Sequence, residues 1–176
     1  MDNEELDLRD KDIRKVLIVS DSHGVSYNLD KVINVMNDCM DLMIHAGDII
    51  TDPDIIRSKI RCPMAVVRGN CDFNTDLPLT MKIHLKGHDI FLMHGTGYYT
   101  GDKKTLTDMA AANGCDVMVV GHTHVPDVYH DRERNIYLAN PGSITRPRQE
   151  PSIPTYLVMN INDDGSLEFV PVKLNY

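Results

Sequence analysis

"KVLIVSDSHGVSYNLDKVINVMND" (15–38) joins an apolar run to a polar loop and then to an amphipathic segment. The apolar run 15–20 has the length of a short buried strand. The segment 28–38 carries apolar residues at the spacing of one helix face, namely Leu29, Val32, Ile33 and Met36. The stretch therefore predicts a strand followed by a helix, which is the repeating unit of α/β proteins.

The same pattern recurs downstream. "DLMIHA" (41–46) predicts a strand, "DPDIIRSKI" (52–60) predicts a helix, and "MAVVR" (64–68) predicts the next strand. Asp52 and Pro53 have the residue types that open helices. Strands that are separated by helices imply right-handed crossovers, so we expect a largely parallel sheet.

The rest of the chain has a different pattern. Residues 81–94 predict two strands joined at Lys86, Gly87 and His88, which is a hairpin, and a helix over 103–114 and a strand over 116–120 follow. After them we expect four strands: "DVYHD" (127–131), "NIYLAN" (135–140), "TYLVMNI" (155–161) and "LEFVPVKL" (167–174). Parallel units combined with antiparallel hairpins predict an α/β protein with two mixed sheets.

Length and composition are those of an ordinary globular domain. We expect residues 1–13 to be a charged N-terminal arm and residues 14–176 to be a single domain. The acidic opening and the lack of a long apolar run argue against a leader peptide and a membrane helix, so we expect a cytoplasmic protein. Four scattered cysteines without CxxC pairing fit reduced thiols. The formal net charge of −8 disfavours an extended nucleic-acid footprint, while a homo-oligomer stays open.

Polar residues follow five of the predicted strands at their ends. The motifs are "DSHG" (21–24), "GD" (47–48), "GNCD" (69–72), "HG" (94–95) and "GHTH" (121–124). Because the carboxyl ends of neighbouring parallel strands lie on one rim of a sheet, we expect these segments to meet there. Each motif alone is weak evidence, since a single His or Asp at a strand end is usually structural.

Together the motifs supply carboxylates, imidazoles and an amide oxygen, from Asp21, His23, Asp48, Asn70, His94, His122 and His124. This is too large a set for one tetrahedral zinc ion, and it suits two transition metals that share a bridging carboxylate. Two divalent ions roughly 3.5 to 4 Å apart can clamp a phosphoryl group and make a hydroxide near neutral pH.

In this order, the five motifs resemble the calcineurin-like metallophosphoesterase superfamily. With "NPGSITRPR" (140–148), the chain is similar to the small single-domain phosphodiesterase branch over about residues 14 to 174. The resemblance implies a four-layer α/β/β/α sandwich of two mixed β-sheets flanked by helices. It also implies that one metal ion is held by Asp21, His23, Asp48 and His124. The second ion would be held by Asp48, Asn70, His94 and His122, with Asp48 as the bridge.

The function implied by the resemblance is hydrolysis of small phosphate diesters by a metal-bridging hydroxide, with Asn70 and His94 as catalytic residues. The resemblance points to Mn as the metal, and the ligand types also allow Ni, Fe, Zn or Co. Two alternatives stay open. One is a phosphomonoesterase, which uses the same metal clamp, and the other is a catalytically weak protein-interaction scaffold, since the retromer complex contains a subunit of this fold.

The chain departs from the family pattern at Cys71, where many members have a histidine suited to protonating the leaving group. Cys71 is either a small structural side chain or a catalytic thiol. Softer candidates are the guanidinium groups of Arg146 and Arg148 for phosphate, Asn140 and Ser143 for the cleft or the loop shape, and Tyr98 and Tyr99 for a cover over substrate. Asp72 is a candidate brace for the Asn70 loop. We expect His45, His84, His88 and His130 to be structural.

Overall fold

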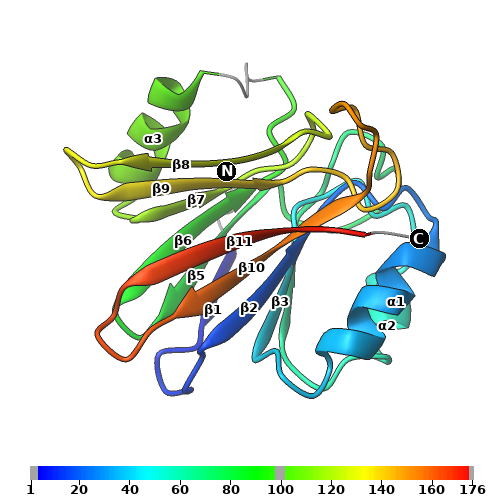
Figure 1. The fold of residues 1–176 in the computed structure, drawn as a ribbon, viewed down its shortest axis with the longest axis horizontal. Helices are drawn as coiled ribbons and strands as arrows, with labels where there is room; N and C mark the ends of the chain where they lie inside the picture. The colour runs from blue at the N-terminus through cyan, green and yellow to red at the C-terminus, as the bar shows by residue number, and fades with distance from the viewer. Residues whose placement is uncertain (1–3, 98–101, 175–176) are drawn as a thin grey trace.

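The computed structural model describes residues 4–97 and 102–174. Two mixed sheets pack face to face, and helices cover their outer faces, which gives the expected α/β/β/α layers (Figure 1). Helices α1 (Ser26–Met36) and α2 (Pro53–Arg57) lie on one side, and α3 (Lys103–Ala112) lies on the other. No helix in these described ranges is both long and apolar enough to cross a membrane.

The first sheet has six strands and the second has five. In spatial order the first contains β1 (Glu4–Asp7), β5 (Thr80–Leu85), β6 (His88–Met93), β7 (Val117–Val119), β9 (Ile136–Pro141) and β8 (Pro126–Asp131). The second contains β11 (Leu167–Lys173), β10 (Thr155–Ile161), β2 (Lys15–Val19), β3 (Leu42–His45) and β4 (Met64–Val66). Strands β2, β3 and β4 are parallel, as the βα units predict, while β5–β6, β8–β9 and β10–β11 are antiparallel hairpins.

Three apolar clusters hold these layers together. The largest lies between the two sheets and includes Val16, Ile18, Ile44, Ile83 and Leu92. A second joins the five-stranded sheet to the apolar face of α1, which is the face predicted from the sequence: Leu29, Val32, Ile33 and Met36. A third joins α3 to the six-stranded sheet through Leu106 and Ala110. Burial on this scale stabilises the fold by roughly 25 cal/mol per Å² of apolar surface.

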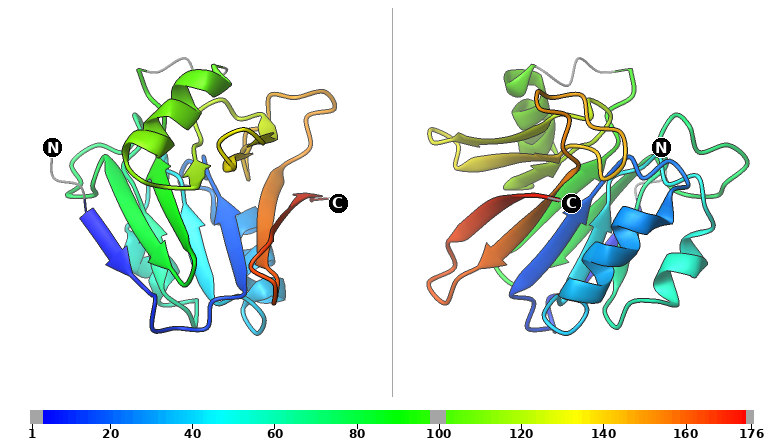
Figure 2. Two further views of the ribbon diagram at one scale, coloured as in Figure 1. Left: turned by 90° about the vertical axis from the view of Figure 1, so that its left-hand side faces the viewer. Right: turned by 45° about the vertical axis from the view of Figure 1, so that its right-hand side comes forward.

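The chain differs from our expectation at its start. Residues 4–7 of the expected charged arm form β1, which pairs in parallel with β5 at the edge of the six-stranded sheet (Figure 2). Leu8 and Ile13 are buried in the core between the sheets. Leu6 and Leu8 alternate with charged residues here, and this short alternation is a weaker pattern than the run of charges around it. Charged side chains on an edge strand also discourage pairing with another chain.

The second expected helix is shorter than predicted, because α2 ends at Arg57 and only a turn at residues 58–59 follows it. Its start is as expected, since Asp52 Oδ1 accepts a hydrogen bond from Asp54 N at 2.9 Å and Pro53 occupies the first turn. With its N-terminus fixed in this way, α2 carries the chain from the loop after β3 back to β4.

Candidate metal centre

All seven predicted ligand residues lie in loops that follow strands. Asp21 and His23 follow β2, Asp48 follows β3, and Asn70 comes after β4. On the other sheet His94 follows β6, and the last two residues follow β7: His122 and His124. The structure brings these five loops to one rim of the sandwich, so segments about 100 residues apart in sequence come into contact.

Backbone strain gathers at the same place. Five of the seven residues have a left-handed φ between 48° and 69°: Asp21, His23, Asp48, His122 and His124. Residues other than glycine rarely adopt a left-handed φ, and each residue held there costs on the order of 1 kcal/mol or more. The packed sheets beneath the loops hold the backbone in this form, which aims the five side chains at a common centre.

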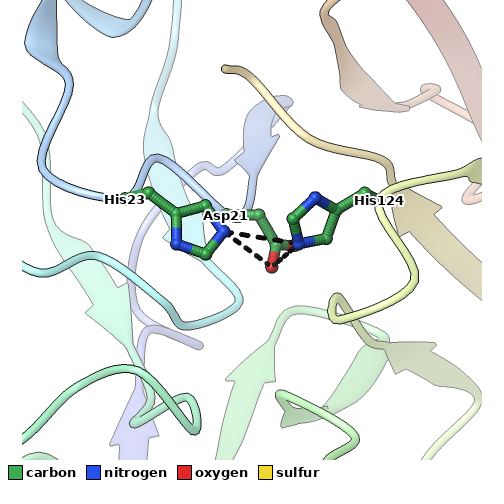
Figure 3. A group of neighbouring side chains, drawn as sticks. All are labelled: Asp21, His23 and His124. Atoms are coloured by element: carbon green, nitrogen blue, oxygen red, sulfur yellow. Dashed lines mark hydrogen bonds and ion pairs between the residues drawn. The ribbon is translucent and has the colours of Figure 1, made fainter. Parts of the chain in front are cut away.

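Asp21, His23 and His124 form one half of the centre (Figure 3). His124 Nε2 lies 3.1 Å from Asp21 Oδ1 and 3.3 Å from His23 Nε2. His23 Nε2 lies 3.9 Å from a carboxylate oxygen of Asp21 and equally far from one of Asp48. All three residues of Figure 3 are buried, so these donor atoms face one another and not solvent.

Asp48, Asn70 and His94 form the other half. His94 Nε2 lies 3.5 Å from Asp48 Oδ1 and 3.2 Å from Asn70 Oδ1. Asp48 therefore lies between the two halves, with one oxygen 3.9 Å from His23 Nε2 and the other 3.5 Å from His94 Nε2. The ring of His122 packs edge-on against that of His94, with 5.1 Å between centroids, although His122 is in none of the three described groups of close donor atoms.

Two backbone carbonyls orient the imidazoles. His94 Nδ1 donates to Ala46 O at 2.7 Å, and His124 Nδ1 donates to Arg146 O at 2.6 Å. In a neutral ring, Nε2 then carries a lone pair and no proton. The lone pair of His94 faces Asn70 Oδ1 and that of His124 faces Asp21 Oδ1, and both oxygens can only accept hydrogen bonds. Asp21 Oδ1 and His23 Nδ1 are also buried without a hydrogen-bond partner among the described residues. Acceptors that face acceptors fit a site built for cations.

A proton competes with a metal ion for this site. Burial by itself lowers the pKa of His124, but the contact with Asp21 raises it above its ordinary value. Burial would raise the pKa of Asp21, and His124 lowers it below the ordinary value of a carboxyl group. Metal binding here is therefore expected to release a proton.

Asp72 braces the loops that carry the ligands. It is buried, and its two oxygens accept hydrogen bonds from Ile50 N at 2.7 Å and Gly69 N at 2.8 Å. Asp72 thus links the loop after β3 to the loop after β4, and the predicted brace is present. Asn140 and Ser143 shape the neighbouring loop, because Asn140 Nδ2 donates to Gly121 O and Ser143 Oγ donates to Asp21 O.

A cavity of about 270 Å³ opens over the centre. Its lining contains the exposed residues Arg146 and Arg148, Cys71, and five of the predicted ligands: His23, Asp48, Asn70, His122 and His124. The positive charge of Arg146 contributes to a lowered pKa of His23, after the larger effect of burial. Two guanidinium groups and candidate metal ligands therefore share one cavity. Tyr98 and Tyr99 lie outside the described residues.

Cys71 lies at the edge of this cavity. Its backbone N–H donates to Asp48 Oδ1 at 2.7 Å, and Asn70 Nδ2 approaches its sulfur at 3.3 Å. Burial, followed by the hydrogen bond to Asp48, raises the pKa of the thiol to about 11. The thiol is therefore protonated at neutral pH, which favours a structural role over a nucleophilic thiolate.

His45 was expected to be structural, and it lies directly beneath the centre. It is fully buried, its Nε2 is 2.9 Å from Ser22 Oγ, and burial lowers its pKa to about 4. The unfolded chain, with a pKa near 6.5, therefore takes up this proton first as the pH falls. His45 therefore does not affect the free energy of unfolding above about pH 6.5. As the pH falls from 6.5 to about 4, it lowers that free energy progressively.

Replacing His45 by glutamine is expected to make the loss of stability between pH 6.5 and pH 4.5 shallower. Removing up to one bound proton changes the slope of the unfolding free energy by up to about 1.4 kcal/mol per pH unit. Urea unfolding at several pH values measures this, with His130→Gln on β8 as the matched control. Equal slopes in the His45→Gln variant and the unmodified protein would contradict the assignment.

Sequence reasoning missed the groups that act through the backbone. The carbonyls of Ala46 and Arg146 orient two imidazoles, and no side-chain pattern marks them. The glycines gave a partial signal. A Cβ on Gly69 would lie 2.1 Å from Asp48 Oδ1, and one on Gly47 would lie 2.7 Å from His94 Nδ1, so both glycines are needed for close approach.

Sequence comparisons with known proteins find similar chains. A family model described as the calcineurin-like phosphoesterase superfamily domain matches residues 15–164. The probable metallophosphoesterase YsnB of Bacillus subtilis is 33% identical over 154 residues, which cover 86% of each protein. The phosphodiesterase YfcE of Escherichia coli is 34% identical over 99 residues, which cover 52% of this chain and 50% of YfcE.

Solved structures show the same architecture. The crystal structure of a predicted phosphoesterase from Streptococcus pneumoniae superposes with a TM-score of 0.74 at 26% identity, and covers 92% of this chain and 98% of its own. Vps29 from Entamoeba histolytica, solved in complex with Zn²⁺, has a TM-score of 0.70 at 25% identity, and covers 92% of this chain and 99% of its own.

Proposed function

Because this chain belongs to the calcineurin-like phosphoesterase superfamily, whose members depend on metal ions, we propose that it is a metal-dependent phosphodiesterase with a dinuclear centre. The observation that supports the proposal is the convergence of seven candidate metal ligands from five loops on one rim, where five of them line a cavity together with two arginines. A purely structural cluster would not need buried acceptors that face one another.

Asp21, His23, Asp48 and His124 would hold one ion, and the second would lie between Asp48 and a further three residues: Asn70, His94 and His122. Imidazole and carboxylate donors suit several transition metals, and we propose Mn, with Ni, Fe, Zn and Co as alternatives. When bound, two divalent ions would polarise the phosphoryl oxygens and lower the pKa of water toward neutrality.

The chain itself positions the substrate. Arg146 and Arg148 present guanidinium groups that can pair with phosphate oxygens through two hydrogen bonds each. Ala46 O and Arg146 O keep the Nε2 atoms of His94 and His124 directed at the centre. Hydrolysis would then occur by direct attack of water on phosphorus, because the thiol of Cys71 stays protonated and is a poor nucleophile.

The surroundings of the central cavity favour a diester over a monoester. A cavity of about 550 Å³ shares Cys71 with it, and another of about 410 Å³ shares Asn70. A phosphate group held at the centre would therefore have space for an ester group on either side. YfcE, which is described as a phosphodiesterase, is a relative over about half of the chain and supports the same subtype.

The test is hydrolysis of bis(p-nitrophenyl) phosphate by metal-stripped protein, with and without added Mn²⁺, beside p-nitrophenyl phosphate. We expect activity to return with metal and to favour the diester. His94→Ala should lower kcat by about 10³-fold, because it removes a proposed ligand of the second metal ion. His130→Ala on β8 should change kcat less than twofold. Folded protein that is inactive with every divalent metal would contradict the proposal.

The likeness to Vps29 favours one alternative, a protein-interaction scaffold. In that case the loops would serve as a binding surface, and the metal ligands would be dispensable. His94→Ala separates the two functions, since a scaffold would bind its partner unchanged and a hydrolase would lose turnover.

A further inference from the structure

The cavity of about 550 Å³ beside the metal centre is formed by two loop segments, 49–53 and 71–77. Its volume is within the range of ligand pockets, which is roughly 300 to 1,000 Å³. Cys71 lines both this cavity and the one over the metal centre. A substrate group in the larger cavity would therefore lie next to a phosphate held in the cavity over the metal centre. We call the larger cavity the flanking cavity.

Two large apolar side chains that line the flanking cavity are exposed. Phe73 is 77% exposed and Ile50 is 46% exposed. Ile50 also has a φ of 52°, which is a strained conformation for a β-branched residue, and Asp72 holds it there by accepting from Ile50 N at 2.7 Å. The brace that joins the ligand loops thus also keeps an apolar side chain on the cavity wall. Strain of this kind is retained where the surrounding structure enforces it.

The charge of the flanking cavity differs from that of the metal centre. Among the residues that the structure describes, its lining contains the carboxylates of Asp52, Asp72 and Asp76 and no Lys or Arg, whereas Arg146 and Arg148 line the central cavity. Asp72 is committed to two backbone N–H groups and Asp52 caps α2, while Asp76 is exposed. A second phosphate would be repelled here, but hydroxyl groups would find acceptors in the carboxylates and in Asn74 and Thr75.

We infer that the flanking cavity is a subsite for one ester group of the substrate, and that this group is an uncharged ring system with hydroxyl groups. Phe73 stacks on the ring, Ile50 adds a second apolar contact, and Asp76 excludes groups that carry a further phosphate. The inference rests on the proposed phosphodiesterase function and adds its specificity. Base-type rings stack on aromatic side chains without sequence preference, so a nucleoside is a suitable probe.

The test uses three diesters with the same nitrophenolate leaving group: methyl p-nitrophenyl phosphate, thymidine 5′-(p-nitrophenyl phosphate) and its 3′-phosphorylated counterpart. With added Mn²⁺, we expect the KM for the thymidine diester to be about tenfold below that for the methyl diester. Phe73→Ala should abolish this difference at nearly constant kcat, because stacking is the same in ground and transition states. Phe73→Tyr should preserve it. Tyr27→Ala, which removes an aromatic that is 62% exposed and does not line the cavity, is the matched control.

The 3′-phosphorylated diester should have a KM several-fold above that of the thymidine diester, and Asp76→Asn should reduce this gap, most clearly at low salt. If the Phe73→Ala variant keeps the lower KM for the thymidine diester, or if its KM rises equally for all three substrates, the subsite is wrong while the proposed hydrolase function stands. Failure of the unmodified protein to cleave any of the three with metal would instead reject the proposed function.

Discussion

Asp48→Asn is expected to lower Mn²⁺-dependent diester hydrolysis by on the order of 10³-fold or more. Asp48 is the carboxylate that lies between the two halves of the centre, 3.5 Å from His94 Nε2 and 3.9 Å from His23 Nε2. An amide of the same shape keeps an oxygen but loses the negative charge that two cations would share. Turnover of bis(p-nitrophenyl) phosphate and calorimetric titration with Mn²⁺ measure the two effects separately.

Asp54→Asn is the matched control for this variant. Asp54 is an exposed carboxylate in the first turn of α2, where it pairs with Arg57 at 2.9 Å. We expect its activity and metal affinity to match those of the unmodified protein. An Asp48→Asn protein that is folded, and that retains more than about a tenth of the activity, would show that Asp48 does not bridge the metals.

Gly69→Ala is expected to destabilise the protein by about 3 kcal/mol and to lower activity nearly as far as Asp48→Asn. The added methyl group would lie 2.1 Å from Asp48 Oδ1 and 2.3 Å from Asp48 N. The second contact is with backbone, so a rotamer change cannot relieve it, and the loop that carries Asp48 must move. Gly69 N also donates to Asp72 Oδ2, which couples this movement to the brace.

Thermal unfolding of metal-stripped Gly69→Ala and its Mn²⁺ affinity measure this prediction. Gly165→Ala is the control, because its φ of +81° imposes a conformational cost but its Cβ would meet no atom of the described residues within 4 Å. We expect the free energy of unfolding of the control to fall by about 1 kcal/mol and its activity to stay unchanged. Equal stability losses in the two variants, with metal binding intact in both, would mean that the close approach at Gly69 is not needed for the site.

Much of the fold follows from local patterns. The apolar face of α1, the strands of the first βα units and the hairpin between β5 and β6 all agree with the structure, because periodicity reports directly which side of an element is buried. The strand β1 was missed, since only Leu6 and Leu8 mark it among acidic residues. Pairing with β5, more than 70 residues away, is what makes it a strand.

The candidate site was predictable to a similar extent. Strand ends rich in Asp and His pointed to one rim, and the structure brings Asp21, His23 and His124 together from loops about 100 residues apart. The flanking cavity could not be predicted in this way. Phe73 and Ile50 look like ordinary loop residues in sequence, and only the tertiary structure shows that both line one cavity.

The sequence by itself determined the order of strands and helices and the kinds of donor atom that follow each strand, because both depend on residue type and local spacing. Tertiary structure alone decided which lone pairs face one another, which carbonyl orients each imidazole and which carboxylate lies between the two halves. These features depend on distances between loops that only the packing of two sheets establishes. The chemistry of the site therefore comes from the residues, and its geometry comes from the fold.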